Sequence, residues 1–467
     1  MATLKWLERH WETSNVFAIN AATGVGKSFL AKAIIDSLGG HVITPTNLLL
    51  DQYSRSYPKV TLLKGFGTYE CKEAEGISCQ DRRAVCRGFC AGCPASMAAT
   101  KAKLGGTVFA NPISYRALQF TKNWVPPEVL VIDEAHKLFS MASLMFEDKI
   151  MAEEYGLPMV TNQLDLRNWM DRRIESLRTN IDANFKHAQT ASVQKMAKQW
   201  QRLTRLRESL DTPENVMMEW RKDYYRGKKK DYLYLNPIEP PQHVFDKLLR
   251  AKKVVLMSAT LFPSDVEKLV GGRSFKYLDV ASPIPVKQRP VHLRPMESAN
   301  KDTSPAKVAE WIQGQLKLHP GNAIIHVSYA WAARLRPFLF YTVANFKPEE
   351  KAKAVKKFKA EGGVFLAAGC AEGLDLPHEE CRTNIIPMLS KDSLGSAVVQ
   401  RRRAKPGGMK QYDLDTLRTF IQQVGRSTRD ISDWSVTVVG DPQAVWLLRK
   451  YKRELPSSFT EAIHDKG

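Results

Sequence analysis

The 467-residue sequence lacks the features that mark membrane, secreted and repeat proteins. It has no apolar run near the roughly 20 residues that a helix needs to cross a bilayer. No basic-then-apolar leader precedes its first predicted strand, and neither an internal repeat nor a low-complexity tract is visible. These absences predict a globular protein of two or three domains that has no membrane partner and works in the cytoplasm.

Acidic residues are also in short supply. The chain has 49 Asp and Glu against 69 Lys and Arg, which gives a formal net charge of +20. Such an excess of positive charge favours a polyanion such as nucleic acid as the partner. The alternative at this point is an ordinary soluble protein that is merely basic.

Cysteine is scarce, but it is unevenly spread. Five of the seven cysteines fall within residues 71–93, which indicates a reducing compartment with a metal site rather than a disulfide framework. Four thiolates can hold either Zn²⁺ or an iron–sulfur cluster, and ligand softness alone does not decide between them. The candidate ligands, one more than four-coordination needs, are Cys71, Cys79, Cys86, Cys90 and Cys93.

Short apolar runs that alternate with helical segments predict an α/β fold with doubly wound parallel sheets. We expect a first series of strands at 16–20, 41–44, 129–132 and 254–257, with a helix over 28–38. A second series begins near residue 281 after a proline-containing linker. Its predicted strands are 323–327, 364–368 and 435–439.

The segment 138–235 interrupts this pattern and is free of Gly and Pro from 159 to 211. Apolar residues at steps of three and four predict two long helices folded back as a hairpin. The segment ends in an aromatic and basic stretch, 220–234, that could stack on bases and follow phosphates. A solvated loop is the equal alternative for this stretch, and 401–403 is a second basic run of the same kind. The nucleic-acid candidates in the first stretch are Tyr224, Tyr225 and Arg226.

Residues 21–28 read Ala-Ala-Thr-Gly-Val-Gly-Lys-Ser and lie between a predicted strand and a predicted helix, as a phosphate-binding loop requires. Backbone N–H groups of such a loop surround the phosphates of a nucleotide, aided by the positive end of the helix. Lys27 would reach the β- and γ-phosphates, and the Ser28 hydroxyl would bind Mg²⁺. The predicted nucleotide-contacting residues are Thr23, Gly24, Val25, Gly26, Lys27 and Ser28.

An acidic pair follows the buried strand at 129–132. At the carboxyl end of such a strand, Asp133 is placed to hold Mg²⁺ and Glu134 to polarise the attacking water. In the second half, Gln422 opens a segment with Arg426 and Arg429, which share one face of a helix. Their guanidinium groups would stabilise the charge that develops on the γ-phosphate.

These motifs, in this order, resemble the iron–sulfur branch of superfamily 2 helicases, the XPD/DinG type. Asp133-Glu-Ala-His136 is similar to motif II, and Met257-Ser-Ala-Thr-Leu261 to motif III. The similarity extends over nearly the whole chain, through the loop at 21–28 (motif I), 43–46 (motif Ia), 64–71 and 93–94 (around the outer cluster ligands), 326–329 (motif IV), 372–375 (motif V) and 422–429 (motif VI).

The resemblance implies two RecA-like parallel-sheet domains, with a cysteine-rich metal module and a helical arch-like insertion in the first. The expected divisions are 1–68, 107–137 and 236–262 for the first domain, 69–106 for the metal module, 138–235 for the arch and 263–467 for the second domain.

The resemblance also implies an ATP- and Mg²⁺-dependent DNA helicase that moves 5′ to 3′ along a single strand into a forked duplex, as a monomer. Its [4Fe–4S] cluster would be held by Cys71, Cys79, Cys90 and Cys93, with Cys86 as the alternative ligand and zinc as the alternative metal. Residues that would couple hydrolysis to strand movement are Ser258, Thr260, Glu372 and Asp375, and further nucleic-acid contacts are Thr46 and Ser328.

The chain departs from the family in its size and at the nucleotide site. The region before the phosphate loop is short and offers no counterpart of the family's adenine-contacting glutamine, and Gln443 stands where the family often has arginine. The small size suggests a version from a prokaryotic cell or from a virus-infected host cell. Two other functions fit the sequence: a single-strand translocase that does not unwind, and a zinc-containing nucleic-acid-binding protein with a degenerate ATP site.

Overall fold

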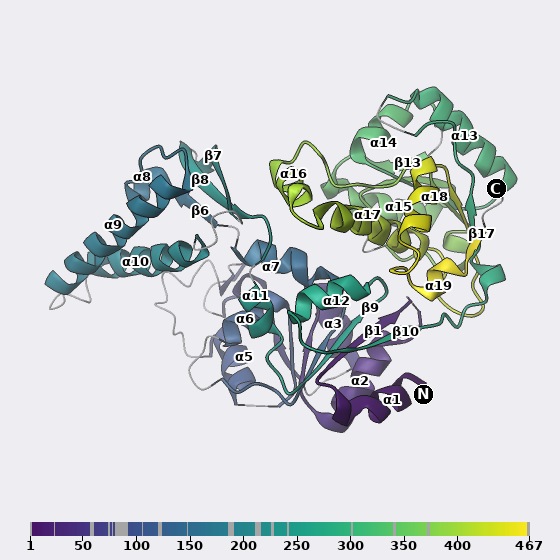
Figure 1. Ribbon diagram of the computed structural model, residues 1–467. Helices are drawn as coiled ribbons and strands as arrows, with labels where there is room; N and C mark the ends of the chain where they lie inside the picture. The colour runs from purple at the N-terminus through teal and green to yellow at the C-terminus, as the bar shows by residue number, and fades with distance from the viewer. Residues whose placement is uncertain are drawn as a thin grey trace. The chain divides into compact units, whose positions relative to one another are not determined.

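The computed structural model describes most of the chain, as residues 2–22, 24–56, 60–72, 75–76, 78–79, 92–104, 106–119, 124–146, 148–184, 191–210, 216–225, 228–240, 242–299, 302–339, 342–370 and 374–464. It divides into two compact units. The first comprises Met1–Leu138, Asp246–Asp392 and Gly407–Gly467, and the second comprises Phe139–Phe245 and Ser393–Pro406. The first unit contains two parallel sheets, and the second contains a helical hairpin and a small antiparallel sheet (Figure 1).

The first sheet has seven strands in the order β10-β1-β9-β5-β2-β4-β3, all parallel. Its central strands are wholly buried because both faces are covered by helices, which explains why they read as continuous apolar runs. The strands are β1 (Val16–Ala21), β2 (His41–Ile43), β3 (Thr61–Leu63), β4 (Val108–Ala110), β5 (Val129–Ile132), β9 (Lys253–Ser258) and β10 (Lys276–Val280).

Helices pack on both faces of this sheet. On one face Leu7, Ile34 and Leu50 from three helices meet Phe17 and Val131 in a single apolar cluster. On the other face the ring of Tyr115 packs edge-on against His41 of β2. The helices of this half are α1 (Ala2–His10), α2 (Lys27–Leu38), α3 (Asn47–Ser56), α5 (Pro94–Lys103), α6 (Pro112–Gln119), α11 (Gln242–Leu248) and α12 (Pro263–Val270).

The first sheet extends beyond the boundary that the sequence predicted after residue 262. Strand β10, at 276–280, pairs with β1 along five residues, from Phe17 opposite Lys276 to Ala21 opposite Val280. The strand is polar and half-buried along its length, because it lies at the edge of the sheet. An edge strand of this kind has no continuous apolar run, so its sequence gives little sign of it.

The second sheet also has seven parallel strands, in the order β13-β14-β12-β15-β16-β11-β17. Val308 and Ala332 from two helices contact one face, and Phe358 from a third helix contacts the other. This double covering confirms the predicted fold of two parallel α/β sheets. The strands are β11 (Val291–Leu293), β12 (Ala323–Val327), β13 (Thr342–Asn345), β14 (Val364–Ala368), β15 (Thr383–Ile386), β16 (Val436–Val439) and β17 (Ile463–His464).

The helices of the second half include α17, which is buried along one side by Leu414, Leu417 and Phe420. This helix leads directly into the predicted segment 422–429. The full set is α13 (Pro305–Leu318), α14 (Tyr329–Leu335), α15 (Lys351–Glu361), α17 (Gly408–Val424), α18 (Pro442–Lys450) and α19 (Ser457–Thr460).

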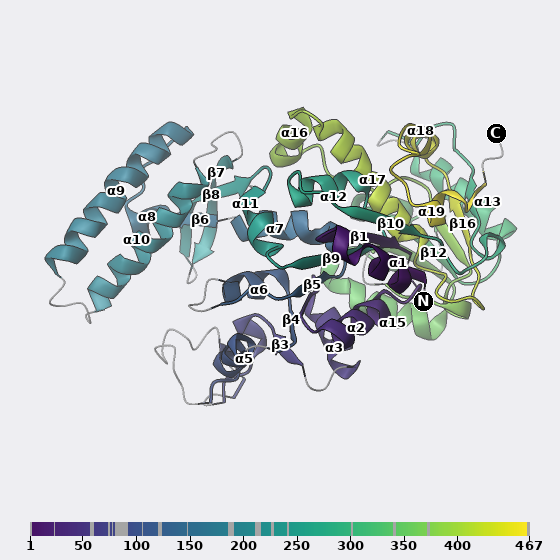
Figure 2. The same cartoon turned by 60° about the horizontal axis from the view of Figure 1, so that its bottom comes forward.

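The second unit contains the predicted helical hairpin. Its helices lie side by side in both views (Figures 1 and 2) and bury Leu166, Leu177, Leu203 and Leu206 between them and the adjoining strands. These leucines belong to the two apolar stripes that the sequence shows. The helices of this unit are α7 (Leu138–Phe146), which begins at the boundary, α8 (Ala152–Tyr155), α9 (Gln163–Ala183), α10 (Ala191–Ser209) and α16 (Ala397–Ala404).

The aromatic and basic stretch 220–234 is not a solvated loop, which corrects that alternative. It forms part of a β-hairpin, in which β7 (Val216–Tyr225) and β8 (Lys228–Pro237) pair antiparallel, and β6 (Asp148–Met151) adds a third strand. Trp220 and Leu233 face each other in this pairing, and Trp220 packs against the core of the unit. Ion pairs between strands neutralise part of the charge. The ammonium of Lys149, for example, lies 2.6 Å from the carboxylate of Asp223.

The second basic run, 401–403, lies in this unit rather than with the second sheet. Helix α16 is joined to the strand hairpin, because Arg402 Nε donates a hydrogen bond to the carbonyl of Ile238 at 2.8 Å. Lys405 and Glu239 approach to 3.6 Å. The insertion therefore has two parts that are far apart in the sequence, 139–245 and 393–406.

No helix in the described part of the chain combines the length and the apolar composition that a bilayer crossing requires.

His326 in β12 is fully buried, and neither ring nitrogen has a hydrogen-bond partner among the described residues. Burial, together with the charges of Arg426 and Lys351, lowers the pKa of this imidazole to about 3. In the unfolded chain the pKa is about 6.5. Between these values the unfolded state binds a proton that the folded state does not, so the free energy of unfolding falls as the pH drops below 6.5.

We therefore expect His326→Leu to reduce the acid sensitivity of the fold. The native protein should lose about 2 kcal/mol from this one group between pH 6.5 and pH 5, whereas the variant should not. Urea unfolding of both proteins at pH 5 and pH 8 measures the difference. An equal loss of stability in the two proteins would contradict the role of this histidine.

Candidate functional site

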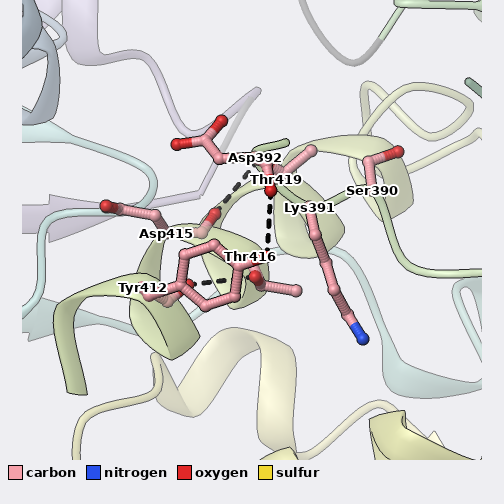
Figure 3. Close-up of a pocket in the computed structure, with 7 residues that line it drawn as sticks. All are labelled: Ser390, Lys391, Asp392, Tyr412, Asp415, Thr416 and Thr419. Carbon is pink, nitrogen blue, oxygen red and sulfur yellow. Dashed lines mark hydrogen bonds between the residues drawn. The ribbon is translucent and has the colours of Figure 1, made fainter. Parts of the chain in front are cut away.

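A small pocket of about 170 Å³ lies beside α17 and is lined by polar residues (Figure 3). Three of its hydroxyl groups donate to backbone carbonyls. Tyr412 donates to the carbonyl of Asp392 at 2.9 Å, and Thr416 and Thr419 donate to carbonyls of their own helix. The pocket contains none of the predicted site residues. The predicted phosphate loop and Asp133 lie instead at the carboxyl edge of the first sheet.

The predicted phosphate loop connects β1 to α2. Gly24 and Gly26 have φ angles of 82° and 84°, which glycine adopts without strain, and Gly26 caps the helix that Lys27 begins. The ammonium of Lys27 donates to the carbonyl oxygens of Ala21 at 3.1 Å and Ala22 at 3.3 Å.

Of the other predicted nucleotide-contacting residues, Val25 is half-buried, Ser28 is exposed and Thr23 lies outside the described residues. The loop thus has the strand–loop–helix setting that was predicted.

Asp133 follows β5 at the same edge of the sheet and is buried. Its carboxylate accepts hydrogen bonds from the Tyr53 hydroxyl and from the backbone N–H of Glu134, each at 3.0 Å. Burial and the neighbouring Glu134 carboxylate raise the pKa of Asp133 to about 6, while Lys27 acts in the opposite direction. A carboxylate held in this way is suited to a divalent cation, which would favour the charged form.

Glu134 itself has a left-handed backbone, with φ of 51°. Only two residues other than glycine have positive φ in the described chain, and such a conformation costs of order 1 kcal/mol or more in a non-glycine residue. The turn directs the Glu134 carboxylate toward Ser258, whose hydroxyl donates to it at 3.3 Å. Backbone strain is therefore located at the residue that would polarise the attacking water.

His136 connects this acidic pair to the second half of the chain. Its Nδ1 lies 2.7 Å from the Ser258 hydroxyl, and its Nε2 lies 2.9 Å from the side-chain nitrogen of Gln422. The Gln422 amide nitrogen can only donate, so the proton of the neutral imidazole is on Nδ1. Ser258 also accepts from the backbone N–H of Thr260 at 3.1 Å. A continuous path of hydrogen bonds therefore runs from Glu134 through Ser258 and His136 to Gln422.

His136 was not among the predicted site residues, although it is the last residue of the motif at 133–136. Its role is not visible in the sequence, because its partners lie 122 and 286 residues away. The predicted coupling residues Ser258 and Thr260 do meet in this path. Glu372, the third, lies outside the described residues.

The two predicted arginines contact the loop before residue 377. Arg426 donates to the carbonyl of Leu374 at 3.1 Å, and Arg429 donates to the same carbonyl at 3.2 Å. Arg429 also forms an ion pair with the exposed Asp375, the fourth predicted coupling residue. The two guanidinium groups thus share one carbonyl. The predicted common helix face is not present, because α17 ends at Val424, before both arginines.

Gly24 and Arg429 meet across the two halves of the site. A Cβ atom added to Gly24 would lie 2.2 Å from the carbonyl oxygen of Arg429, which is far inside van der Waals contact. Only glycine permits this approach. The backbone of the predicted phosphate loop therefore touches the predicted arginine segment.

Three of the five clustered cysteines are described, and all three are buried in one small apolar cluster with Ala95. The sulfur atoms of Cys79 and Cys93 are 3.8 Å apart. Burial alone would raise the pKa of Cys93, but hydrogen bonds with Ser96 and Cys79 lower it to about 7. Burial and the same Cys93 contact raise the pKa of Cys79.

Thiolate sulfur is a soft ligand, so the chemistry of these three side chains fits a soft metal. Within the described part of the chain, no group of three or more potential ligands is arranged to hold an ion. Cys86 and Cys90, the remaining candidates, lie outside the described residues.

Two of the predicted nucleic-acid contacts cap helices. Thr46 precedes α3 and accepts from Leu49 N–H at 3.3 Å, and Ser328 precedes α14 and accepts from Trp331 N–H at 3.3 Å. Both side chains are exposed. Tyr224 and Tyr225 have backbone positions in β7, opposite Lys229 and Lys228, and Arg226 lies outside the described residues.

The fold and the predicted site can now be compared with known proteins. Residues 322–462 match the model of the helicase C-terminal domain family. No curated protein matches the chain.

Three solved structures are similar over nearly its whole length. An XPD helicase is 15% identical, with a TM-score of 0.60, over 96% of this chain and 98% of that chain. An XPD apo structure is 15% identical, with a TM-score of 0.58, over 97% and 98%. Xpd4 of S. tokodaii is 14% identical, with a TM-score of 0.56, over 99% and 98%. The chain therefore has the fold of XPD helicases, which confirms the predicted resemblance at the level of the fold.

The close approach of Gly24 and Arg429 generates a prediction. Gly24→Ala should reduce nucleotide hydrolysis at least tenfold, because the added Cβ would separate the loop from the arginine segment. Gly39→Ala is the matched control, since Gly39 also has positive φ, at 67°, but has open space where the Cβ would be. Both variants should lose about 1–2 kcal/mol of stability from backbone strain, and only Gly24→Ala should lose hydrolysis. Equal hydrolysis in the two variants would show that the contact does not matter.

Proposed function

We propose that the protein is an ATP-dependent DNA helicase that translocates 5′ to 3′ along a single strand and separates a forked duplex. The observation that carries the proposal is the hydrogen-bond path from Glu134 through Ser258 and His136 to Gln422. Such a path gives the second sheet a direct contact with the residues that would act on the γ-phosphate. A change in the phosphate state can therefore be transmitted to the other half of the chain.

In this proposal the first half binds ATP and Mg²⁺. Lys27 neutralises the terminal phosphates, Ser28 and Asp133 hold Mg²⁺, and Glu134 polarises the attacking water. The buried Asp133 supports the assignment, since a cation would offset the burial that raises its pKa.

The second half supplies Arg426 and Arg429. Both guanidinium groups donate to the carbonyl of Leu374, a neutral acceptor. A γ-phosphate attracts a guanidinium group more strongly than a peptide carbonyl does, because the phosphate carries negative charge and the carbonyl is neutral. We infer that the two arginines exchange this carbonyl for the phosphate during hydrolysis.

The nucleic-acid partner is proposed to be single-stranded DNA at a fork. The net charge of +20 and the exposed hydroxyls of Thr46 and Ser328 support contacts with a phosphate backbone. Tyr224, Tyr225 and Arg226 remain candidates for contacts with bases. We propose that the protein acts as a monomer in the cytoplasm.

The cysteine cluster is proposed to hold a [4Fe–4S] centre through Cys71, Cys79, Cys93 and either Cys90 or Cys86, with zinc as the alternative. The burial of the three described thiols and the 3.8 Å approach of two sulfurs support it. Such a centre would cross-link three separate stretches of chain and so rigidify the module.

The proposed activity is tested by unwinding of matched duplexes that carry either a 5′ or a 3′ single-stranded tail. We expect ATP-dependent unwinding of the 5′-tailed duplex only, by protein purified without oxygen. Lys27→Ala should lower ATP hydrolysis by at least a hundredfold, because the phosphates lose their one loop cation. DNA-stimulated hydrolysis without unwinding of either duplex would instead identify a translocase, and full hydrolysis in Lys27→Ala would refute the site.

The metal assignment is tested by Cys93→Ala. Iron or zinc content, measured on the purified protein, should fall to near zero, because removal of one of four ligands opens the site. Nucleotide binding should remain, since the cysteines and the phosphate loop are separate. Cys381→Ala, a buried cysteine in the second half, is the control and should keep its metal. Unchanged metal content in Cys93→Ala would exclude it as a ligand.

A further inference from the structure

Phe29 stands out among the apolar side chains of the first unit. It is 78% exposed, although it lies on α2, which buries Ile34 and Ile35 against the first sheet. Single exposed apolar residues are common on protein surfaces. Phe29 differs in its position, because it follows Ser28 directly and so lies in the first turn of the helix that begins at the phosphate loop.

The ring of Phe29 lies against the end of that loop. A Cβ atom built on Gly26 would be 3.7 Å from Cδ2 of Phe29, which is ordinary van der Waals contact. The ammonium of Lys27, in contrast, points to the start of the loop, where it donates to Ala21 and Ala22. An aromatic face and a cation therefore lie at opposite ends of the same short loop.

A nucleoside triphosphate has the matching polarity. Lysine at this position reaches the β- and γ-phosphates, while the loop N–H groups surround the α- and β-phosphates. The nucleoside then leaves the loop on the side away from the ammonium, and its base is the one flat apolar group of the ligand. Aromatic side chains bind such groups by stacking.

We propose that Phe29 is the base-binding residue of the nucleotide site and that it stacks on the base of the bound nucleoside triphosphate. This inference rests on the proposed function, because it requires that the loop bind phosphates. Every base has a π face, and stacking on a phenyl ring does not read the hydrogen-bonding edge of the base. The contribution of Phe29 is therefore similar for adenine, guanine, cytosine and uracil, and the substrate class is nucleoside triphosphates in general rather than ATP alone.

The stacking role of Phe29 agrees with the lack of an adenine-contacting glutamine in this sequence. A glutamine that contacts adenine reads its edge, and the short segment before the phosphate loop has no counterpart of it. A stacking residue supplies affinity without that selectivity, because an apolar contact discriminates weakly between ligands of similar shape.

The test is isothermal titration of the full-length protein with three Mg²⁺-bound probes: AMP-PNP, GMP-PNP and inorganic tripolyphosphate, which has no base. We expect Phe29→Ala to weaken AMP-PNP and GMP-PNP binding by similar factors, roughly five- to a hundredfold, the range for one base on one aromatic ring. Tripolyphosphate binding should stay within about twofold of the native value. Phe29→Trp should retain binding of both nucleotides.

Leu38→Ala is the matched control, because Leu38 is a 50% exposed apolar residue at the far end of the same helix. It should leave all three affinities unchanged. An equal loss of tripolyphosphate and nucleotide binding in Phe29→Ala, or no loss of nucleotide binding, would refute the stacking role and leave the proposed function intact. If the native protein binds neither nucleotide nor tripolyphosphate, the proposed function itself fails, and the role of Phe29 fails with it.

Discussion

The imidazole of His136 is the contact on which the site depends, because it holds together three parts of the chain that are distant in sequence. Its two ring nitrogens meet Ser258 and Gln422, and Ser258 in turn meets Glu134. A network of this kind is cooperative, since each hydrogen bond orients the donor of the next. The strained backbone of Glu134 is tolerated because its side chain is fixed in this network. The neutral tautomer with its proton on Nδ1 is the form that satisfies both partners at once.

Parallel strand order explains why these parts meet at all. Strands β1, β9 and β5 are neighbours, and the chain leaves each of them at the same edge of the sheet. Ser258 is the last residue of β9, and the phosphate loop and Asp133 follow β1 and β5, so the order of the sheet brings them together. The second sheet reaches the same place through α17, whose last turn contains Gln422. The carbonyl of Arg429 approaches Gly24 at this edge and restricts that loop position to glycine.

Features that depend on neighbouring residues could be predicted from the sequence, whereas features that depend on distant partners could not. The continuous apolar runs of β5, β12 and β14 are recognisable because buried parallel strands need no polar face. The hairpin of β7 and β8 was missed because its charges alternate with aromatic residues and are balanced only across the strands. The assignment of α16 to the second unit depends on a contact with Ile238, 164 residues away. The motifs named the residues of the site but not their contacts: neither the shared carbonyl of Leu374 nor the bridging role of His136 has a local signal.

The division of the chain between its two units has a consequence for synthesis on the ribosome. Strands β9 and β10 of the first sheet emerge only after residues 139–245 have been made, so the insertion begins to fold while the sheet that carries it is still incomplete. The insertion in turn lacks α16 until residue 406 has emerged, long after its own helices and strands are present. The first unit is therefore completed by residues that follow 139–245, and the second unit is completed by residues that follow 246–392. Neither unit has all of its residues before a part of the other has been synthesised. A nascent chain of this design exposes an unpaired edge of β1 for more than 200 residues of elongation, and such an edge is a template for pairing with other chains.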